Sequence, residues 1–363
     1  MKNTFGNNLS VTLFGESHGE AIGCVIDGIA PGIKIDNEYV KGCLLQRAAR
    51  SDISTPRREA DEPIFVSGVK NGVTEGTPVC ILIKNENVRS GAYCEIEFTP
   101  RPSHADLTAE YKYPGDPDKA GGGHFSGRIT APLVAAGAVI RRALLEKGIK
   151  IGTHIKTLHG ISDRDFECYD NDIDALNVEL FPALDSEAAK KMQGEIRAAR
   201  DMLDSVGGVL ETVITGVPVG VGEPWFDTVE GVISHAVFSV PGVKGVEFGD
   251  GFAIAGKYGS EANDPYTVDN GNVVPTKNSS GGIIGGITNG APIIFRTAVK
   301  PTPSITKEQR SVNLKTNAEV TLSIGGRHDP AIIHRARAVV DAVAAISIAD
   351  LLVTRFGTDF LKG

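Results

Sequence analysis

The residues between Pro100 and Ala131 combine side chains that bind anions with side chains that transfer protons. Arg101 and Arg128 can each bind a phosphate or carboxylate through two parallel hydrogen bonds. His104 titrates near neutral pH and can serve as an acid or a base. Three consecutive glycines, 121–123, allow backbone N–H groups to approach a ligand closely. The stretch is typical of an anion site with an acid or base beside it and, equally, of a glycine-rich surface turn with solvated charges.

A long helix is expected directly after this loop. Ser126 is a favourable N-cap residue, and the chain from there to about Lys147 is rich in alanine and valine, with Gly148 placed to end the helix. The positive end of such a helix favours a phosphate or carboxylate at its start. Apolar residues lie nearly all round this helix, so it should be buried on more than one side.

Two further loops in the first half carry polar side chains that could face a cleft. His18 lies between an expected strand at 9–15 and the next at 23–27, where a polar hairpin tip would explain it equally well. An expected helix at 36–49, capped by Asp36, runs into an arginine-rich loop. Its arginines would repel one another unless an anion lies among them, although a charge run is usually a solvated face. They are Arg47, Arg50, Arg57 and Arg58.

The second half repeats the order of strands, glycine-rich segment and long helix. Strands are expected at 209–220, 293–299 and 318–324, and Asp227 and Glu230 form a capping box for a helix ending near Phe238. The glycine-rich segment 281–290 matches neither nucleotide-binding pattern, which leaves open a close backbone approach to a flat ligand.

The last helix is expected to start at Asp329 and Pro330, a cap followed by proline at the first helical position. It would run to about Phe356, with Gly357 ending it. A cap role is the simpler explanation of Asp329. Arg327 could then reach into a pocket just before the cap.

These elements predict an α+β fold in which two buried helices, at 126–147 and 330–356, lie between antiparallel sheets. We expect one domain over residues 1–363, with an acidic, weakly patterned excursion at its periphery at about 149–185.

Composition narrows the class of ligand. The net charge of −8 and the pI near 5.6 argue against nucleic acid or a membrane surface as the main partner. Clustered arginines in an acidic protein favour a small anionic ligand instead. Five dispersed cysteines without a C-x-x-C pair fit a reducing cytosol and predict neither disulfides nor a metal site. We expect a cytoplasmic protein, because no signal-peptide core or membrane-length apolar run is present.

Six segments taken together resemble the chorismate synthase family, in that family's order and over nearly the whole chain. They are GESHG (15–19), RPSHAD (101–106), GGG-x-x-S-x-R-x-TA (121–131), the 281–290 segment, KPTPSI (300–305) and GRHDP (326–330).

The resemblance implies conversion of 5-enolpyruvylshikimate 3-phosphate to chorismate and phosphate by 1,4-anti elimination, the last common step toward aromatic amino acids. It implies a requirement for reduced FMN without net redox change. The reductant would come from outside this chain, derived from NADPH through an external flavin reductase, since no reductase domain is evident. The family also implies a homotetramer.

The resemblance also assigns roles to residues. His18 would protonate the departing phosphate, His104 would act as an acid beside the flavin, and Asp329 would assist proton removal near flavin N5. The implied anion ligands are Arg47, Arg57, Arg101, Arg128 and Arg327. The implied flavin contacts are His124, Phe125, Ser126, Pro241, Gly242, Gly285, Lys300, Pro301, Thr302, Pro303, Ser304 and Arg327.

Two departures from the family pattern bear on these roles. The family usually has Arg-Ser-Ser-Ala-Arg where this chain has His124-Phe-Ser-Gly-Arg128. Its Arg-Arg-Arg-Pro-Gly run is here Leu45-Gln-Arg47-Ala-Ala49, and Asp52 replaces a further arginine. The first change alters the expected flavin phosphate contacts, and the second alters any nicotinamide contact.

Overall fold

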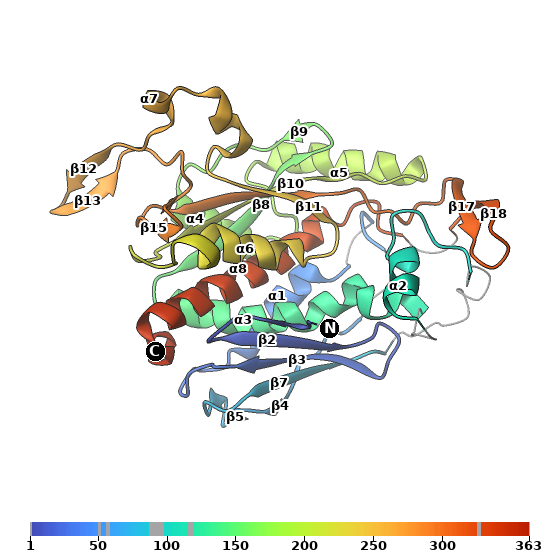
Figure 1. Cartoon of the computed structure of the whole chain (residues 1–363), viewed down its shortest axis with the longest axis horizontal. Helices are drawn as coiled ribbons and strands as arrows, with labels where there is room; N and C mark the ends of the chain where they lie inside the picture. Colours follow the sequence, from blue (N-terminus) through green and yellow to red (C-terminus); the bar gives the residue numbers. More distant parts are fainter. Residues whose placement is uncertain are drawn as a thin grey trace.

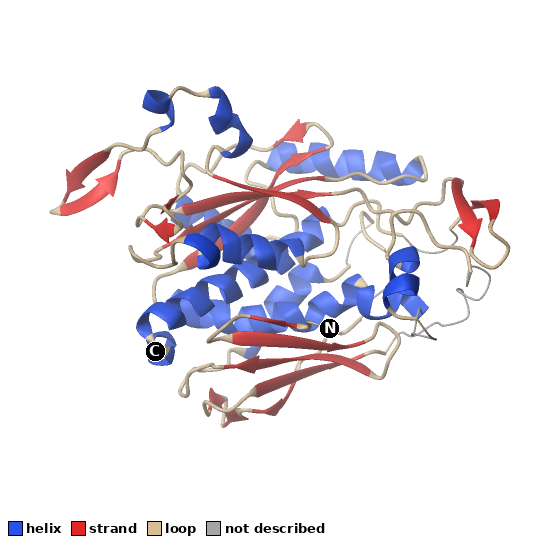
Figure 2. Cartoon of the chain, viewed as in Figure 1, coloured by secondary structure: helices blue, strands red, loops and turns tan. Residues whose placement is uncertain are grey.

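The computed structural model of the chain describes residues 2–49, 52–55, 59–86, 98–114, 120–324 and 328–362. Two antiparallel sheets enclose a layer of helices (Figures 1 and 2). This arrangement confirms the predicted α+β sandwich. Among the described residues, no helix combines the length and apolar character that crossing a membrane requires.

The first sheet has the order β1-β2-β3-β7-β4 and covers one side of the helices. Alternate residues of β3 and β7 face the helices, as Ile22, Cys24, Ile81 and Ile83 are fully buried. Its strands are β1 (Thr4–Phe5), β2 (Ser10–Gly15), β3 (Ala21–Asp27), β4 (Ile64–Ser67) and β7 (Val79–Lys84), with a small hairpin of β5 (Val69–Lys70) and β6 (Val73–Thr74) beside them.

The second sheet has the order β11-β16-β10-β8-β9 and covers the other side. Its strands are β8 (Lys150–Leu158), β9 (Ile161–Ser162), β10 (Gly208–Thr215), β11 (Val243–Phe248) and β16 (Ile293–Val299). Two helices, α4 (Tyr169–Val178) and α5 (Ser186–Asp201), belong to its outer side.

The expectation that residues 149–185 lie wholly at the periphery is wrong for β8. This strand has neighbours on both sides and is mostly buried. The sequence of β8 does not indicate a buried strand, because polar residues alternate with isoleucines. In the structure both faces of the strand are covered. Thr153 faces the central helices, whereas Gly152 packs under Ile173 of α4.

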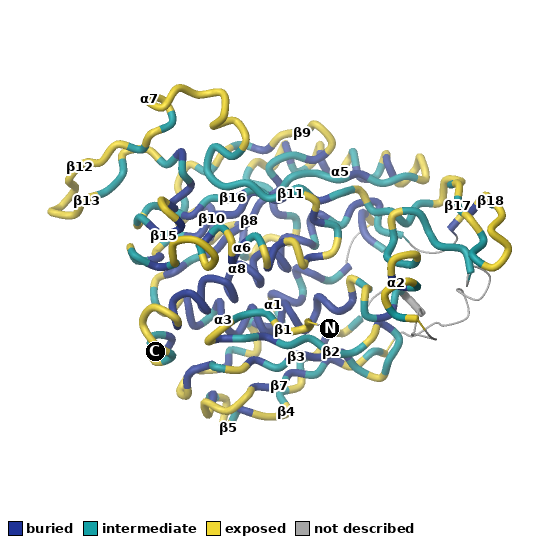
Figure 3. The backbone as a smooth tube through the Cα atoms, viewed as in Figure 1, coloured by how far each residue is buried: buried dark blue, intermediate teal, exposed yellow. Residues whose placement is uncertain are grey.

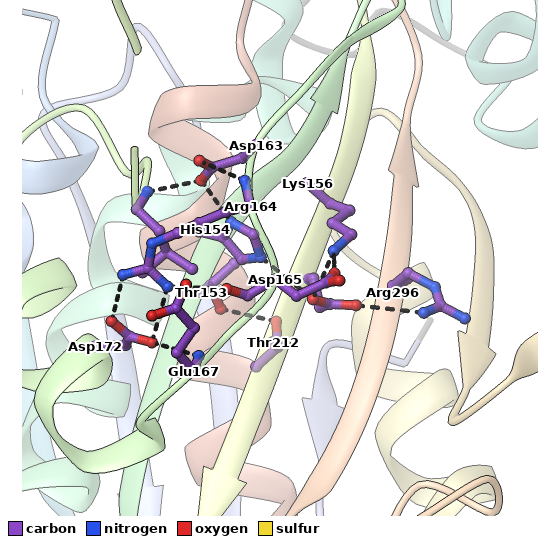
Figure 4. A network of polar contacts seen from close by, with 12 residues as sticks. Thr153, His154, Lys156, Asp163, Arg164, Asp165, Glu167, Asp172, Thr212 and Arg296 are labelled. Atoms are coloured by element: carbon purple, nitrogen blue, oxygen red, sulfur yellow. Dashed lines mark hydrogen bonds and ion pairs between the residues drawn. The ribbon is translucent and has the colours of Figure 1, made fainter. Parts of the chain in front are cut away.

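A polar network holds the outer side of this sheet together (Figure 4). His154 on β8 is fully buried between Asp163 (2.8 Å) and Glu211 of β10 (3.3 Å). Burial alone would lower the pKa of His154, but the two carboxylates outweigh it and raise the pKa. Asp163 also accepts hydrogen bonds from the backbone of Leu184 and Asp185, so it fastens the start of α5 to the sheet.

The central layer consists of α1 (Asn37–Arg47), α3 (Thr130–Glu146), α6 (Val229–Phe238) and α8 (Ile333–Phe356). The tube in Figure 3 is buried along most of α3 and α8, as the apolar pattern predicted. A Cβ added at Gly137 of α3 would lie 2.5 Å from the Cα of Ala342 of α8. Only glycine therefore permits this approach between the two helices.

Helix boundaries follow the sequence at some ends and depart from it at others. Asp36 caps α1 by accepting from the backbone of Tyr39, and Gly357 ends α8 with φ of 84°. The cap of α6 is Thr228 rather than Asp227. The predicted start of α8 at Asp329 is wrong: the helix begins at Ile333, because groups other than the helix backbone occupy the Asp329 carboxylate.

The remaining elements are small and peripheral. They are α2 (Asp106–Lys112), α7 (Gly259–Ala262), β12 (Tyr266–Asp269), β13 (Asn272–Pro275), β14 (Ile283–Ile284), β15 (Ile287–Thr288), β17 (Gln309–Asn313) and β18 (Ala318–Leu322). Residues 251–277, which include α7 and the β12–β13 hairpin, form an arm that extends away from both sheets (Figure 1).

Replacing Gly137 with alanine should destabilise the protein by about 1–3 kcal/mol, because the new methyl group forces α3 and α8 apart. Gly194 of α5 is the matched control, since a Cβ there meets nothing within 4 Å. Gly194→Ala should be neutral or stabilising by about 0.5–1 kcal/mol. Urea unfolding measures both changes, and equal effects of the two substitutions would contradict the close approach.

Candidate active site

A cavity of about 300 Å³ lies where the end of α1, the segment before α3 and the first turn of α8 meet. The beginnings of two central helices thus bring positive dipole ends to one place. Six charged side chains line the cavity, three of each sign. They are Arg47, Glu59, Asp61, Arg128, Asp329 and Arg335.

One buried carboxylate holds two of the arginines. Oδ2 of Asp61 accepts from Nη2 of Arg47 at 2.9 Å, and its Oδ1 accepts a very short hydrogen bond from Nη1 of Arg128. Burial alone would raise the pKa of Asp61, but the two guanidinium groups outweigh it and lower the pKa. Asp61 also has φ of 48°, a left-handed conformation that aspartate tolerates better than most residues.

Arg47 retains an unused donor. Its Nη1 reaches the carbonyl of Gly127 and the hydroxyl of Thr130, but its buried Nε finds no acceptor among the described residues. Burial and the neighbouring Arg335 and Arg128 lower the pKa of Arg47 to about 10, so the group stays charged at neutral pH. A buried cationic N–H without a partner favours an anion in the adjoining cavity.

Asn85 joins the loop that carries His18 to this arginine cluster. Its Nδ2 donates to the carbonyls of Glu16 (3.0 Å) and Gly19 (2.8 Å), and its Oδ1 accepts from Nε of Arg128 (3.0 Å). His18 lies in the turn between those two carbonyls and is half-buried. The His18 turn and Arg128 are therefore positioned by one amide.

The glycine-rich loop packs against the same turn. The backbone N–H of Ser17 donates to the carbonyl of Gly123, and Nδ1 of His124 donates to the carbonyl of Gly15. Ser126 caps a short 3-10 turn, Gly127–Ile129, by accepting from the N–H of Arg128. The predicted start of the long helix at Ser126 is therefore wrong: α3 begins at Thr130 after this turn, and its N-cap residue, Ile129, makes no side-chain cap bond.

A second group of predicted residues lies around His104. Its Nδ1 donates to the carbonyl of Pro102 (3.0 Å), so its Nε2 accepts from the hydroxyl of Ser304 (2.7 Å) in the neutral ring. Burial and the nearby Arg101 lower the pKa of His104. The ring is therefore neutral near pH 7 in this state of the protein.

Lys300 connects the His104 segment to the cavity wall. Its Nζ donates to the carbonyl of Ser103 (2.8 Å), and its backbone N–H donates to the carbonyl of Gly242 (2.9 Å). Pro241, directly before Gly242, lines the cavity. Arg101 binds within its own segment: its side chain and its backbone N–H both donate to the carboxylate of Asp106.

The structure brings most of the predicted site residues to this region. Arg47, Ser126, Arg128, Pro241 and Asp329 line the cavity. His18, His104, His124, Gly242, Lys300 and Ser304 belong to the segments that adjoin it. Pro301, Thr302 and Pro303 continue the Lys300 segment, Phe125 is half-exposed, and Arg57 and Arg327 lie outside the described residues.

Gly285 is the exception. It forms the β14–β15 turn, whose Gly286 carbonyl accepts from Val229 at the start of α6. Pro241 follows the other end of α6, about 15 Å along a helix of this length. Within one chain, Gly285 is therefore separated from the cavity.

Sequence reasoning missed three residues of the site, Asp61, Asn85 and Arg335. Asp61 follows the arginine-rich loop. The excess of positive charge in that loop was the signal that a nearby carboxylate would pair with its arginines. Nothing in the sequence indicated that Asn85, just after β7, would bind Arg128. Arg335 was hidden in the apolar pattern of α8.

Comparison with known proteins identifies the family. The family model for chorismate synthase matches residues 9–353. The chain belongs to the chorismate synthase family. A chorismate synthase of Pyrococcus abyssi is 46% identical over 350 residues, covering 96% of this chain and 97% of the relative. One of Lachnoclostridium phytofermentans is 43% identical and covers 99% of this chain and 98% of the relative.

A crystal structure of a chorismate synthase has a TM-score of 0.76 to this chain at 26% identity, covering 97% of this chain and 94% of that one.

The structure of this chain also shows what one residue that departs from the family pattern does. Asp52, where the resemblance leads us to expect an arginine, accepts a hydrogen bond from Nε of Arg197 on α5 at 2.6 Å, and Arg200 donates to its carbonyl. Asp52 therefore ties this segment to α5.

Replacing Asp61 with asparagine should destabilise the protein by about 3–5 kcal/mol at neutral pH, because two buried guanidinium groups lose their counter-ion. Asparagine keeps the size of the side chain and also tolerates the left-handed backbone. Since the pKa of Asp61 is lowered, its contribution is present above its unfolded pKa of about 3.9 and is lost as pH falls further.

Asp52→Asn is the matched control, since it removes a solvent-exposed ion pair worth about 0–1 kcal/mol. Denaturant unfolding of both variants between pH 3 and 8 measures the difference. A loss for Asp61→Asn no larger than that for Asp52→Asn would contradict the counter-ion role.

Proposed function

We propose that this protein converts 5-enolpyruvylshikimate 3-phosphate to chorismate and inorganic phosphate by a 1,4-anti elimination that requires reduced FMN and causes no net oxidation. Family membership supports the lyase activity. The observation that carries the proposal to this chain is the single cavity lined by Arg47, Arg128 and Asp329. Such a site offers an anion-binding side and a proton-accepting side to one ligand.

The substrate carries a phosphate and two carboxylates, so its charge must be met by several cations. Arg47 and Arg128 supply two, and the unused Nε of Arg47 is a donor that an incoming anion can satisfy. Asp61 holds both side chains in place before the ligand arrives, which reduces the ordering cost of binding.

The elimination breaks two bonds and forms a new ring double bond. The C–O bond to phosphate breaks, and the electron pair leaves with the phosphate, which His18 would protonate. The ring C–H bond also breaks, and Asp329 would assist removal of that proton. General acid or base assistance of this kind contributes about 10²–10⁴-fold per group.

The residues around Lys300 fit a flavin mononucleotide. The hydroxyl Oγ1 of Thr302 is buried and has no partner among the described residues. Pro241 is exposed and precedes Gly242, whose carbonyl accepts from the backbone N–H of Lys300. Lys300 and the backbone of 301–304 could hold the phosphate and the ring edge. When bound, reduced FMN would transiently donate electron density to the substrate and take up the ring proton at N5.

His104 is neutral in the structure, so its proposed role as an acid requires a proton on Nε2, which here accepts from Ser304. A bound anion would favour that protonated ring. The His104 step should therefore depend on ligand binding.

Substitution of His18 or His104 by alanine should each lower turnover by about 10²–10⁴-fold while the protein stays folded. The measurement is phosphate release from the substrate under anaerobic conditions with reduced FMN, alongside thermal unfolding. His159→Ala is the control, because the ring of His159 is exposed and, among the described residues, pairs with Glu195 on α5 and with no residue of the cavity. Turnover near the wild-type rate in both variants would remove these histidines from the mechanism.

The same assay separates the lyase from two alternatives. Tight FMN uptake without phosphate release would favour a flavin- or phosphate-binding protein, an alternative raised by the changes at His124 and Phe125. Failure to bind either ligand would favour a structural, oligomeric protein.

Reduced FMN would be supplied from outside, through an external flavin reductase that draws on NADPH. The described cysteines are free thiols, which supports a cytoplasmic location.

We also propose that the protein is a homotetramer. Large aromatic side chains are unusually exposed on the arm and beside α6, with Phe226 95% exposed and Trp225 84% exposed in a left-handed conformation. Phe252 and Tyr258 of the arm are similarly exposed. Such surface is better explained by contact with further copies of the chain than by contact with water.

Light scattering should therefore give a mass four times that of the 38.3-kDa chain. Replacing Trp225 and Phe226 together with serine should reduce that mass, because the proposed contacts lose their apolar anchors. Val178→Ser, an exposed apolar residue at the end of α4, is the control. A monomeric wild-type protein would contradict the tetramer.

A further inference from the structure

Both oxygens of the Asp329 carboxylate are held by groups from different parts of the chain. Oδ1 accepts from the backbone N–H of Thr55 at 2.7 Å, and Oδ2 accepts from Nη1 of Arg335 at 2.5 Å. The two ion-paired side chains are 14% and 18% exposed. Asp329 is therefore not a freely rotating surface carboxylate.

Arg335 has a second attachment on the opposite side. Its Nε donates to the backbone carbonyl of Arg47 at 2.8 Å. Arg47 is the last residue of α1, where carbonyl groups lack partners within the helix. The planar guanidinium thus spans from the end of α1 to Asp329, and its fixed geometry sets where the carboxylate points.

These contacts form two sets of hydrogen bonds beside the cavity that meet at Arg47, one at its backbone and one at its side chain. The first runs from Asp329 through Arg335 to the backbone of Arg47, and the second from the Arg47 side chain through Asp61 to Arg128. Asp329 is therefore linked to Arg47, and through Arg47 and Asp61 to Arg128, by the side chain of Arg335.

We infer that Arg335 is the positioning residue for Asp329, holding its carboxylate at a fixed place relative to the anion bound by Arg47 and Arg128. The inference rests on the proposed function, in which Asp329 assists removal of the ring proton. The competing explanation is that the Arg335–Asp329 pair only stabilises the start of α8. The two explanations differ in what happens to the proton-transfer step.

The charged groups near Asp329 are few among the described residues. Arg335 and His334 come from α8, and the cavity faces it with Arg47, Arg128, Asp61 and Glu59. The buried His334 has a pKa lowered to about 4 and is neutral, with its Nε2 3.0 Å from the hydroxyl of Ser54. Of these groups, only Arg335 is hydrogen-bonded to the Asp329 side chain through its own side chain.

The test compares Arg335→Gln with a matched control, Arg200→Gln. Arg200 also fastens the 52–55 segment, because it donates to the carbonyl of Asp52, but it does not touch Asp329. Arg335→Gln should lower kcat about 10²-fold with a much smaller change in KM, since misplacement of the acceptor slows chemistry more than binding. Arg335→Lys, which retains a cation near Asp329, should fall between Gln and wild type.

The isotope effect separates positioning from stability, and amide exchange reports whether the Asp329 carboxylate has lost an anchor. With substrate deuterated at the ring carbon that loses hydrogen, the isotope effect on kcat should rise in Arg335→Gln and stay at the wild-type value in Arg200→Gln. Without substrate or flavin, the amide of Thr55 should exchange faster in Arg335→Gln, because its acceptor has lost one of two anchors. An unchanged isotope effect in Arg335→Gln would overturn the inference and leave a structural role, whatever the exchange of the Thr55 amide.

Asp329→Asn distinguishes this failure from failure of the proposed function. Slow turnover in Asp329→Asn with normal kinetics in Arg335→Gln would overturn only the role of Arg335. Wild-type turnover in Asp329→Asn would remove Asp329 from proton transfer and, with it, the basis of the inference. Absence of phosphate release by the wild-type protein would overturn the proposed function itself.

Discussion

A single buried carboxylate, Asp61, makes it energetically feasible for Arg47 and Arg128 to lie buried side by side at the ends of the central helices. Two guanidinium groups without a counter-ion would repel each other and would be costly to bury. With Asp61 between them, they remain charged and oriented before any ligand arrives. The rest of the site is arranged around that triad, through Asn85 on one side and Arg335 on the other.

The sandwich supplies the rigidity that this arrangement needs. Arg47 ends α1, Arg128 precedes α3 and Asp329 precedes α8, so three central helices determine the relative positions of the charged groups. The tight contact at Gly137 and Ala342 keeps α3 and α8 at a fixed separation. Sheets on both sides bury these helices, and the helix ends are where polar groups can face the cavity.

The sequence predicted the layers well because hydrophobic pattern and turn chemistry are local. The two buried helices, the cap at Asp36 and the stop at Gly357 all follow from nearby residues. Prediction failed where tertiary contacts decided the outcome. In the sequence, Asp329 has the pattern of a helix cap, but in the structure its carboxylate binds Thr55 and Arg335. The polar residues of β8 suggest a peripheral strand, but in the structure they are buried by α4 and by partners such as Asp163. Asn85 and Arg335 enter the site only through contacts distant in sequence, so no local pattern could reveal them. Motif resemblance supplied His18, His104 and Arg128, which spacing alone left undecided.

A crystal structure of the protein with oxidised FMN and 5-enolpyruvylshikimate 3-phosphate would test the central claim most directly. The account predicts a phosphate or carboxylate oxygen of the substrate within hydrogen-bonding distance of Arg47 or Arg128, with Asp61 still between the two arginines and Asp329 facing the ring. A substrate bound away from this cavity, with the arginine pair untouched, would contradict it.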